Sequence, residues 1–228
     1  LSTVTTSDNI TFTATLTPSA SVEDATNVIT LANTGVSDIA GNAGTGTTDS
    51  NNYAVDTLNP TLNVNIVAAS LNDGSNSSTV TFEFSEAVTG FDASDVSVSG
   101  GVLSGFSGSG ASYSATFTAN DDLEATGSVS VAADSYTDAA SNSGGAGSDD
   151  VAIDTLNPTL TVNIVAASLN DGANSSTVTF EFSEAVTGFD ASDVSVPGGV
   201  LSGFSGSGAS YSATFTANDD LETTGSVN

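Results

Sequence analysis

The sequence contains no lysine, arginine, histidine, cysteine, methionine or tryptophan, whereas aspartate and glutamate together number 27. Because no side chain carries a positive charge, side-chain salt bridges cannot form, and each carboxylate must be hydrated, hydrogen-bonded or bound to a metal ion. The oxygens of Asp, Glu and Asn are hard ligands that suit calcium. The composition therefore predicts calcium binding. The alternative is a surface that is merely acidic, which favours solubility and opposes compaction.

The same absences exclude several classes of function. Nucleic acids and anionic membrane surfaces attract proteins mainly through Lys and Arg, so neither is an expected partner. No run of about 20 apolar residues is present, so no membrane insertion is expected. Without His, Cys or Lys, no conventional nucleophile–base pair can form, and carboxylates that could hydrolyse glycosides would lack a tryptophan platform for the sugar. We therefore expect a protein that is not an enzyme.

The chain contains a near-perfect internal repeat, because residues 56–129 recur as residues 154–227. A repeat of this length and fidelity predicts an array of copied modules. Even positions expected to face solvent are retained, which favours a mechanical role for each copy over an enzymatic one. The copies differ at four pairs of positions, which are Asn63/Thr161, Ser75/Ala173, Ser99/Pro197 and Ala125/Thr223.

Hydrophobic residues alternate with polar ones through the central copy, as strands with one buried face require. They make up 38% of the chain, and this regular order is absent from disordered acidic sequences, so the chain is expected to fold. Seven short strands separated by Gly-rich and Asn-Asp-Gly turns predict an all-β fold of tandem immunoglobulin-like β-sandwich modules arranged end to end. The predicted strands lie within 62–66, 80–84, 96–98, 102–106, 113–117, 129–131 and 151–153, and the predicted bulky core comprises Phe82, Phe84, Phe91, Phe106, Tyr113 and Phe117.

Two copies of the linker motif Asp-Thr-Leu-Asn-Pro mark the module boundaries. Pro60 and Pro158 favour an extended residue before them and suit the start of an edge strand. We therefore predict the C-terminal part of a module at 1–54, a complete module at 55–152, and a module lacking its last strands at 153–228. The partial modules indicate a slice of a longer chain, or a subunit that its neighbours complete.

Acidic residues gather on the loops and linkers that a sandwich would bring to one pole of each module. Glu23 and Asp24 of the preceding segment would face this cluster from the opposite pole of their own module. A calcium ion with six to eight oxygen ligands would fit such a cluster and stiffen the junction. The alternative is that these acids decorate loops, with Asp95 capping a turn. The candidate ligands are Asp56, Glu86, Asp92, Asp95, Asp138 and Asn142 at the first junction, and Asp154, Glu184, Asp190 and Asp193 at the second.

Three motifs resemble the tandem immunoglobulin-like repeats of giant secreted bacterial adhesins, including RTX-type adhesins exported by type I secretion. They are Phe-Ser-Glu-Ala-Val-Thr-Gly-Phe-Asp-Ala-Ser-Asp-Val at 84–96 and 182–194, Thr-Asp-Ala-Ala-Ser-Asn at 137–142, and the Asp-Thr-x-x-Pro linker. The resemblance implies an extracellular stalk with calcium between its modules and a ligand-binding domain near one end. Because these 228 residues contain no such terminal domain, the adhesive ligand stays open.

These patterns together predict a structural extender of a secreted cell-surface adhesin, stiffened by calcium at module junctions and supporting cell adhesion or biofilm formation. Its partners would be neighbouring modules of the same chain or other copies of itself. The first alternative is a self-assembling extracellular filament, in which one copy donates strands to a broken module of the next. The second alternative is a glycan- or protein-binding module that gains avidity from repeated faces.

Overall fold

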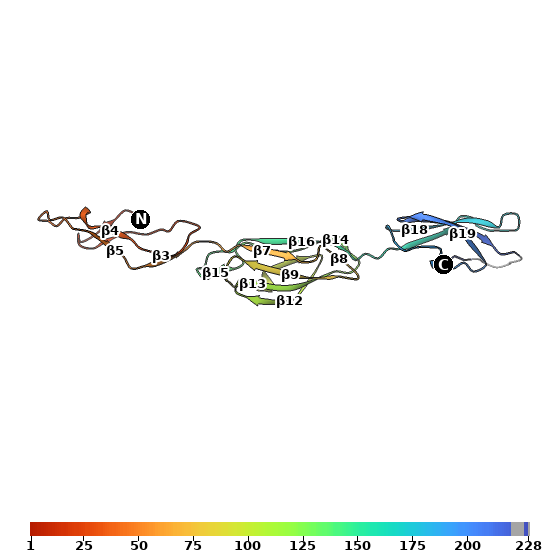
Figure 1. The fold of residues 1–228 in the computed structure, drawn as a ribbon, viewed down its shortest axis with the longest axis horizontal. Coiled ribbons are helices and arrows are strands. Elements are labelled where there is room, and N and C mark those ends of the chain that lie inside the picture. The colour runs from red at the N-terminus through yellow and green to blue at the C-terminus, as the bar shows by residue number, and fades with distance from the viewer. Residues whose placement is uncertain (220–225, 228) are drawn as a thin grey trace. The chain divides into compact units, whose positions relative to one another are not determined.

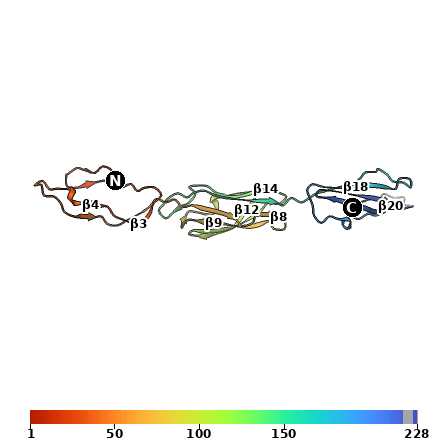
Figure 2. The ribbon, with the colours of Figure 1, turned by 45° about the horizontal axis from the view of Figure 1, so that its top comes forward.

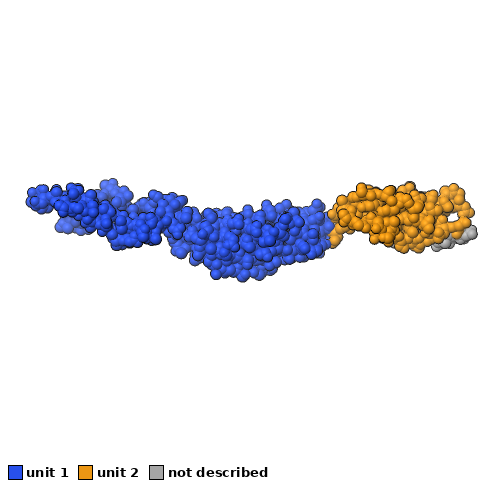
Figure 3. Space-filling model, in the orientation of Figure 1, with its two compact units in different colours: residues 1–156 blue, residues 157–228 orange. Residues whose placement is uncertain are grey.

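The computed structural model describes residues 1–219, 226 and 227. The chain divides into two compact units, Leu1–Leu156 and Asn157–Asn228, which Figure 3 distinguishes by colour. The first unit holds the predicted domains 1–54 and 55–152 together. Thr223, one of the positions at which the two copies differ, lies outside the described residues. In the described part of the chain, no helix is long and apolar enough to cross a membrane.

One sheet of the central module contains four antiparallel strands (Figure 1). In spatial order they are β12 (Gly101–Ser109), β13 (Ser112–Ala119), β9 (Ser77–Phe84) and β7 (Leu62–Ile66). Burial alternates along β9, where Val80 and Phe82 are fully buried, because successive side chains of a strand point to opposite faces. The edge strand β12 has a register shift between Ser104 and Ser107. Such irregularities make an edge a poor template for pairing with other chains.

The second sheet also has four strands, with the spatial order β11 (Val96–Ser99), β14 (Glu124–Val131), β16 (Gly147–Asp154) and β8 (Ser70–Asn72). β8 joins β16 in parallel, whereas the other pairs are antiparallel. In Figures 1 and 2 the strands of both sheets run along the long dimension of the module. The two sheets confirm the all-β, immunoglobulin-like prediction for this module.

All seven predicted strands are present, and three further strands were not predicted. These are β8 and a two-residue pair formed by β10 (Val88–Thr89) with β15 (Thr137–Asp138). A strand of two or three residues is too short for alternation to reveal it. The pair matters for function because it brings Asp138 next to the end of β9.

The core lies where the two sheets pack together, and aromatic rings dominate it. Phe82 packs edge-on against Phe91 with ring centroids 5.5 Å apart. Of the predicted core, Phe82, Phe84, Phe91 and Phe117 are buried, whereas Phe106 and Tyr113 are partly buried and pack against the same cluster. The prediction missed Tyr136, which is only 2% exposed and donates its hydroxyl to the carbonyl of Gly145 at 2.8 Å.

The first segment forms short strand pairs instead of layered sheets. β3 (Glu23–Asn27) pairs with β6 (Tyr53–Asp56), and Glu23 stands opposite Asp56 as Glu124 stands opposite Asp154 in β14 and β16. The first segment therefore shares the strand register of the second half of the central module. The other pairs are β1 (Thr5–Thr6) with β2 (Phe12–Thr13) and β4 (Thr30–Ala32) with β5 (Thr47–Asp49), and a 3-10 turn spans Asn33–Gly35.

The second unit contains one four-stranded sheet among its described residues. Its spatial order is β17 (Leu160–Ile164), β18 (Ser175–Phe182), β20 (Ser210–Ala217) and β19 (Gly199–Ser207), which repeats the first sheet of the central module. A small core surrounds Phe180 and Phe215. Val162 is 36% exposed, whereas its counterpart Val64 is 5% exposed. The difference arises because a second sheet covers Val64 in the central module.

Candidate metal site at the entry to the central module

Three carboxylates converge at one pole of the central module. Asp56 ends β6, Glu86 follows β9, and Asp138 ends β15. One oxygen atom from each of these side chains lies within 4.8 Å of the others. The structure thus brings together three of the ligands predicted for the first junction, and no other group of three acidic residues is as close among the described residues.

Asp138 anchors the cluster because its loop holds it in place. Its side chain is 2% exposed, and it accepts hydrogen bonds from the backbone N–H and the side-chain Nδ2 of Asn142, at 2.8 and 2.7 Å. Ser141 makes the turn between them with a positive φ of 72°. The first segment has the same loop, in which Asp38 accepts both bonds from Asn42. This recurrence indicates that the loop is a fixed local structure of the modules.

Asn142 was predicted as an oxygen ligand, but in this structure it serves as a hydrogen-bond donor. Its Nδ2 also donates to Oδ1 of Asp56 at 3.1 Å, so one amide group bridges two carboxylates. An NH₂ group has no lone pair to offer a cation. In this arrangement Asn142 positions the carboxylates of Asp56 and Asp138, while its prediction as a ligand through the amide oxygen stays a prediction.

The electrostatics of the cluster are unfavourable without a cation. Burial, followed by the negative charges of Asp138, Asp56 and Glu23, raises the pKa of Glu86 above its ordinary value. Desolvation acts in the same direction on Asp138, but the hydrogen bonds from Asn142 and from the backbone of Ala140 and Ser141 together outweigh it and place the pKa of Asp138 below its ordinary value. Asp138 therefore stays ionised, and Glu86 is the group that experiences the repulsion.

The donor set fits calcium. Calcium takes six to eight oxygen ligands at about 2.3–2.6 Å, so two ligands of one ion lie at most about 5 Å apart. The oxygens of Asp56, Glu86 and Asp138 lie within 4.8 Å of one another, which satisfies this limit. An ion bound there would supply the positive charge that the side chains of this protein lack.

A pH experiment tests the repulsion at Glu86. In chelator at pH 7, the substitution Glu86→Gln should stabilise the central module, by less than about 1 kcal/mol because a partly exposed group is screened by solvent. Because the pKa of Glu86 is raised in the folded state, protonation of this group favours folding. Its contribution to the free energy of unfolding of the wild type is complete at pH values below the ordinary pKa of 4.5 and is absent at pH values above the raised pKa. The advantage of E86Q should therefore vanish as the pH falls through the raised pKa towards 4.5. Urea unfolding at several pH values measures the difference in the free energy of unfolding between E86Q and the wild type. A difference that does not change with pH would contradict the electrostatic repulsion at Glu86.

The remaining predicted ligands lie elsewhere. Asp92 accepts a hydrogen bond from the N–H of Ser94, and Asp95 accepts one from the N–H of Asp92, so the pair forms a capping box on the 3-10 turn Ala93–Asp95. Asp190 and Asp193 form the same box in the second unit. The alternative interpretation, in which Asp95 caps a turn, is therefore the one that the geometry matches.

Asp154 and Glu184, which were predicted as ligands at the second junction, belong to different compact units, and their role as ligands stays a prediction. Asp154 stands opposite Glu124 in the sheet of the central module, whereas Glu184 belongs to the second unit. One carboxylate oxygen of Glu184 is buried without a hydrogen-bond partner among the described residues.

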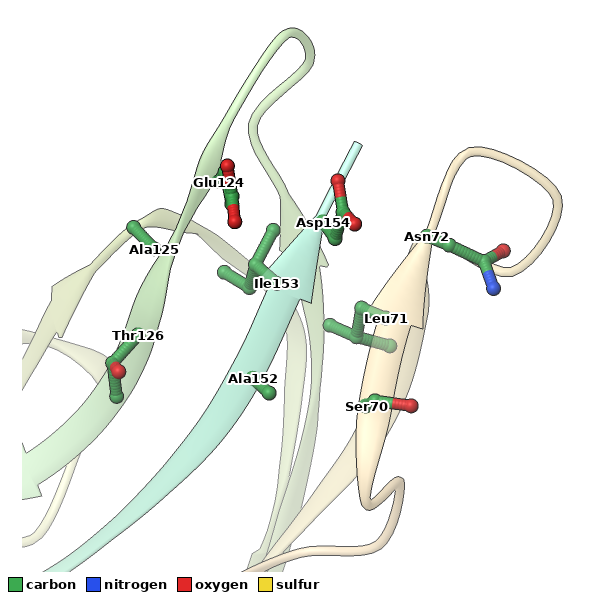
Figure 4. Close-up of a pocket in the computed structure, with 9 residues that line it drawn as sticks. All are labelled: Ser70, Leu71, Asn72, Glu124, Ala125, Thr126, Ala152, Ile153 and Asp154. Atoms are coloured by element: carbon green, nitrogen blue, oxygen red, sulfur yellow. The ribbon is translucent and has the colours of Figure 1, made fainter. Parts of the chain in front are cut away.

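An open groove of about 630 Å³ runs beside the end of the second sheet. Figure 4 shows Glu124 and Asp154 side by side at its upper end, with Asn72 across from them. It offers two carboxylates, one fewer than the triad of Asp56, Glu86 and Asp138. A smaller groove in the first segment flanks the corresponding pair, Glu23 and Asp56. Like charges directly opposite each other destabilise a sheet, so both pairs would gain from a nearby cation.

A comparison with known protein families agrees with this architecture. A family model described as a bacterial Ig-like domain matches residues 1–55, 56–153 and 154–228. Among solved structures, the chain is similar to invasin, a bacterial integrin-binding protein, with 18% identity and a TM-score of 0.40 over 81% of this chain and 40% of that one. A likeness at this level carries no argument about this chain, which covers 40% of that protein. No functionally curated protein matches the chain. Because the three family matches together cover every residue, this protein belongs to the bacterial Ig-like domain family.

Proposed function

We propose that the chain is an extender segment of a bacterial surface adhesin, in which successive Ig-like modules hold a distal binding domain away from the cell. The observation that carries this proposal is the fidelity of the repeat at exposed positions, such as Thr116 and Thr214 or Asp92 and Asp190. A site for one ligand would require identity only around that site. In a rod, by contrast, every copy carries the same mechanical load and faces the same solvent, so identity is expected over the whole exposed surface of the copies.

We also propose that calcium stiffens the entry to the central module. The triad joins the linker residue Asp56 to two loops of the module, those of Glu86 and Asp138. Glu23 of the first segment lies close enough for its charge to raise the pKa of Glu86. One ion at the triad would therefore tie the linker to the module and remove a repulsion that extends across the junction.

The substitution Glu86→Gln tests the calcium site. Removing one of three carboxylates should weaken calcium binding by about tenfold or more, because ligand charge sets the affinity of such sites. Isothermal titration of the full chain with calcium chloride measures this effect. Asp73→Asn is the matched control, because it removes one charge from an exposed turn and leaves the triad intact.

Small-angle scattering of the same samples tests the mechanical role. At a free calcium concentration near the wild-type dissociation constant, calcium should increase the maximum dimension of the wild-type chain and of D73N, and should have little effect on E86Q, whose site would be largely empty. Equal calcium affinity in all three proteins would contradict the proposal that the triad binds calcium. If calcium binds tightly but leaves the scattering curve unchanged, the proposal that calcium stiffens the entry to the central module is contradicted.

The surface location is part of the same proposal. The motif resemblance to secreted adhesins, including those exported by type I secretion, supports an extracellular protein that contributes to adhesion or biofilm formation. The expected partners are neighbouring modules of the same polypeptide.

A filament built from further copies of the chain is the second candidate. The observation that favours it is the half-exposed apolar face of the second unit, where Leu160 is 45% and Val162 is 36% exposed. Strands from a second copy would cover this face, as would further residues of the same polypeptide. Fibres in the purified sample, instead of dispersed particles, would favour the filament.

A further inference from the structure

The threonine of each linker motif is bound to the module that the linker leaves. Thr155 is 2% exposed although it lies at the end of the central module. Its hydroxyl donates to the carbonyl of Asn120 at 2.8 Å and accepts from the N–H of Leu123 at 3.0 Å. Its backbone N–H donates to the carbonyl of Leu123 at 2.8 Å. One residue thus makes three hydrogen bonds to the loop that precedes β14.

Thr57 repeats this arrangement at the other linker. Its hydroxyl donates to the carbonyl of Ser19 at 2.7 Å and accepts from the N–H of Val22 at 3.0 Å. Its backbone N–H donates to the carbonyl of Val22 at 2.8 Å. We call this set of three bonds, made by Thr57 or by Thr155, the threonine clamp.

The two loops that receive the clamp differ in sequence but share one backbone shape. Residues 19–22 read Ser-Ala-Ser-Val, and residues 120–123 read Asn-Asp-Asp-Leu. The third residue of each loop has a positive φ, 56° at Ser21 and 51° at Asp122. Residues other than glycine keep such conformations only where the surroundings impose them. Since the clamp uses only backbone groups of the loop, the shape can be kept while the sequence varies.

The linker after Thr57 is also bound on its other side. The carbonyl of Pro60 accepts a hydrogen bond from the N–H of Gly145, and Thr61 exchanges bonds with Ser85. Leu58 and Asn59 are the residues between the two attachments, and the N–H of Leu58 donates to Asp56 at 3.2 Å. A linker this short and this well bonded has little conformational freedom to lose.

We propose that Thr57 and Thr155 are positioning residues that fix the path of each linker without any metal ion. This inference goes beyond the calcium site, because none of the three bonds of the clamp involves a carboxylate. Two sets of interactions then hold the linker in one conformation. The threonine clamp acts with or without calcium, and the calcium site contributes only when the ion is bound. The clamp should persist in chelator, where the calcium site is empty.

Hydrogen exchange with mass spectrometry in chelator tests the clamp on the full chain. In the wild type, the amides of Val22, Leu123 and Thr155 should be protected. Thr155→Val should speed exchange at Leu123 by about threefold to tenfold, which is the effect of losing one hydrogen bond. Thr57→Val should do the same at Val22. Thr155→Ser keeps the hydroxyl and should restore protection, and Thr126→Val, an exposed change on β14, should alter nothing.

Three outcomes separate this proposal from the calcium site. Unprotected linker amides in wild-type chelated protein would overturn the clamp and leave the calcium proposal intact. Unchanged exchange in T155V would also overturn it, because the hydroxyl would then contribute nothing. If β9 and β13 exchange faster as well, T155V has loosened the whole module, and the failure of T155S to rescue protection would overturn the clamp.

Discussion

Replacing Phe82 by alanine should destabilise the central module by about 3–5 kcal/mol, the usual cost of deleting a buried aromatic ring. Phe82 is fully buried and packs against the rings of Phe91 and Phe106, whose centroids are 5.5 and 5.9 Å away. The loss includes both the transfer of the ring and the cavity it leaves. Since a small domain is stable by about 5–15 kcal/mol, this change would remove a large part of the total.

Hydrogen exchange of peptides from β9 and β13 reports this loss for the central module alone. Val102→Ala is the control, because Val102 is 59% exposed on the edge strand β12 and its loss should cost no more than about 0.5 kcal/mol. Phe180→Ala should loosen the second unit and leave the peptides of β9 protected. A small effect of F82A on β9 would contradict the two-sheet core described here.

The fold was largely predictable because alternation marks each long strand. Val80, Phe82 and Phe84 fall on one face of β9, as their spacing requires. Tyr136 escaped prediction because it stands in a loop with no alternating neighbours. Its burial depends on Gly144, where an added Cβ would lie 2.2 Å from the tyrosine ring. That dependence is a tertiary contact that sequence spacing does not encode.

The candidate site was predictable in part. Alternation of strands up and down a sandwich placed Asp56, Glu86 and Asp138 at one pole, and the structure brings them together. Asp92 and Asp95 were included for the same reason, although their Asp-x-x-Asp spacing is also that of a capping box. The role of Thr57 could not be predicted, because its partners are backbone groups of Ser19 and Val22, which lie far away in the chain.

Calcium should stabilise the central module by about 2.7 kcal/mol when its free concentration is 100 times the dissociation constant. The reason is that, on our proposal, calcium would bind the assembled triad and not the unfolded chain, in which Asp56, Glu86 and Asp138 are far apart. The increase should grow with the logarithm of the calcium concentration. In E86Q, which keeps two of the three carboxylates, a tenfold weaker affinity should reduce the increase to about 1.4 kcal/mol.

Scanning calorimetry of the full chain in calcium and in chelator, repeated with E86Q and D73N, is the most direct examination of whether a bound cation substitutes for absent basic residues. The account predicts that the transition of the central module moves to higher temperature with calcium in the wild type and D73N, and moves no more than about half as far in E86Q. Superimposable wild-type transitions in calcium and in chelator would contradict it.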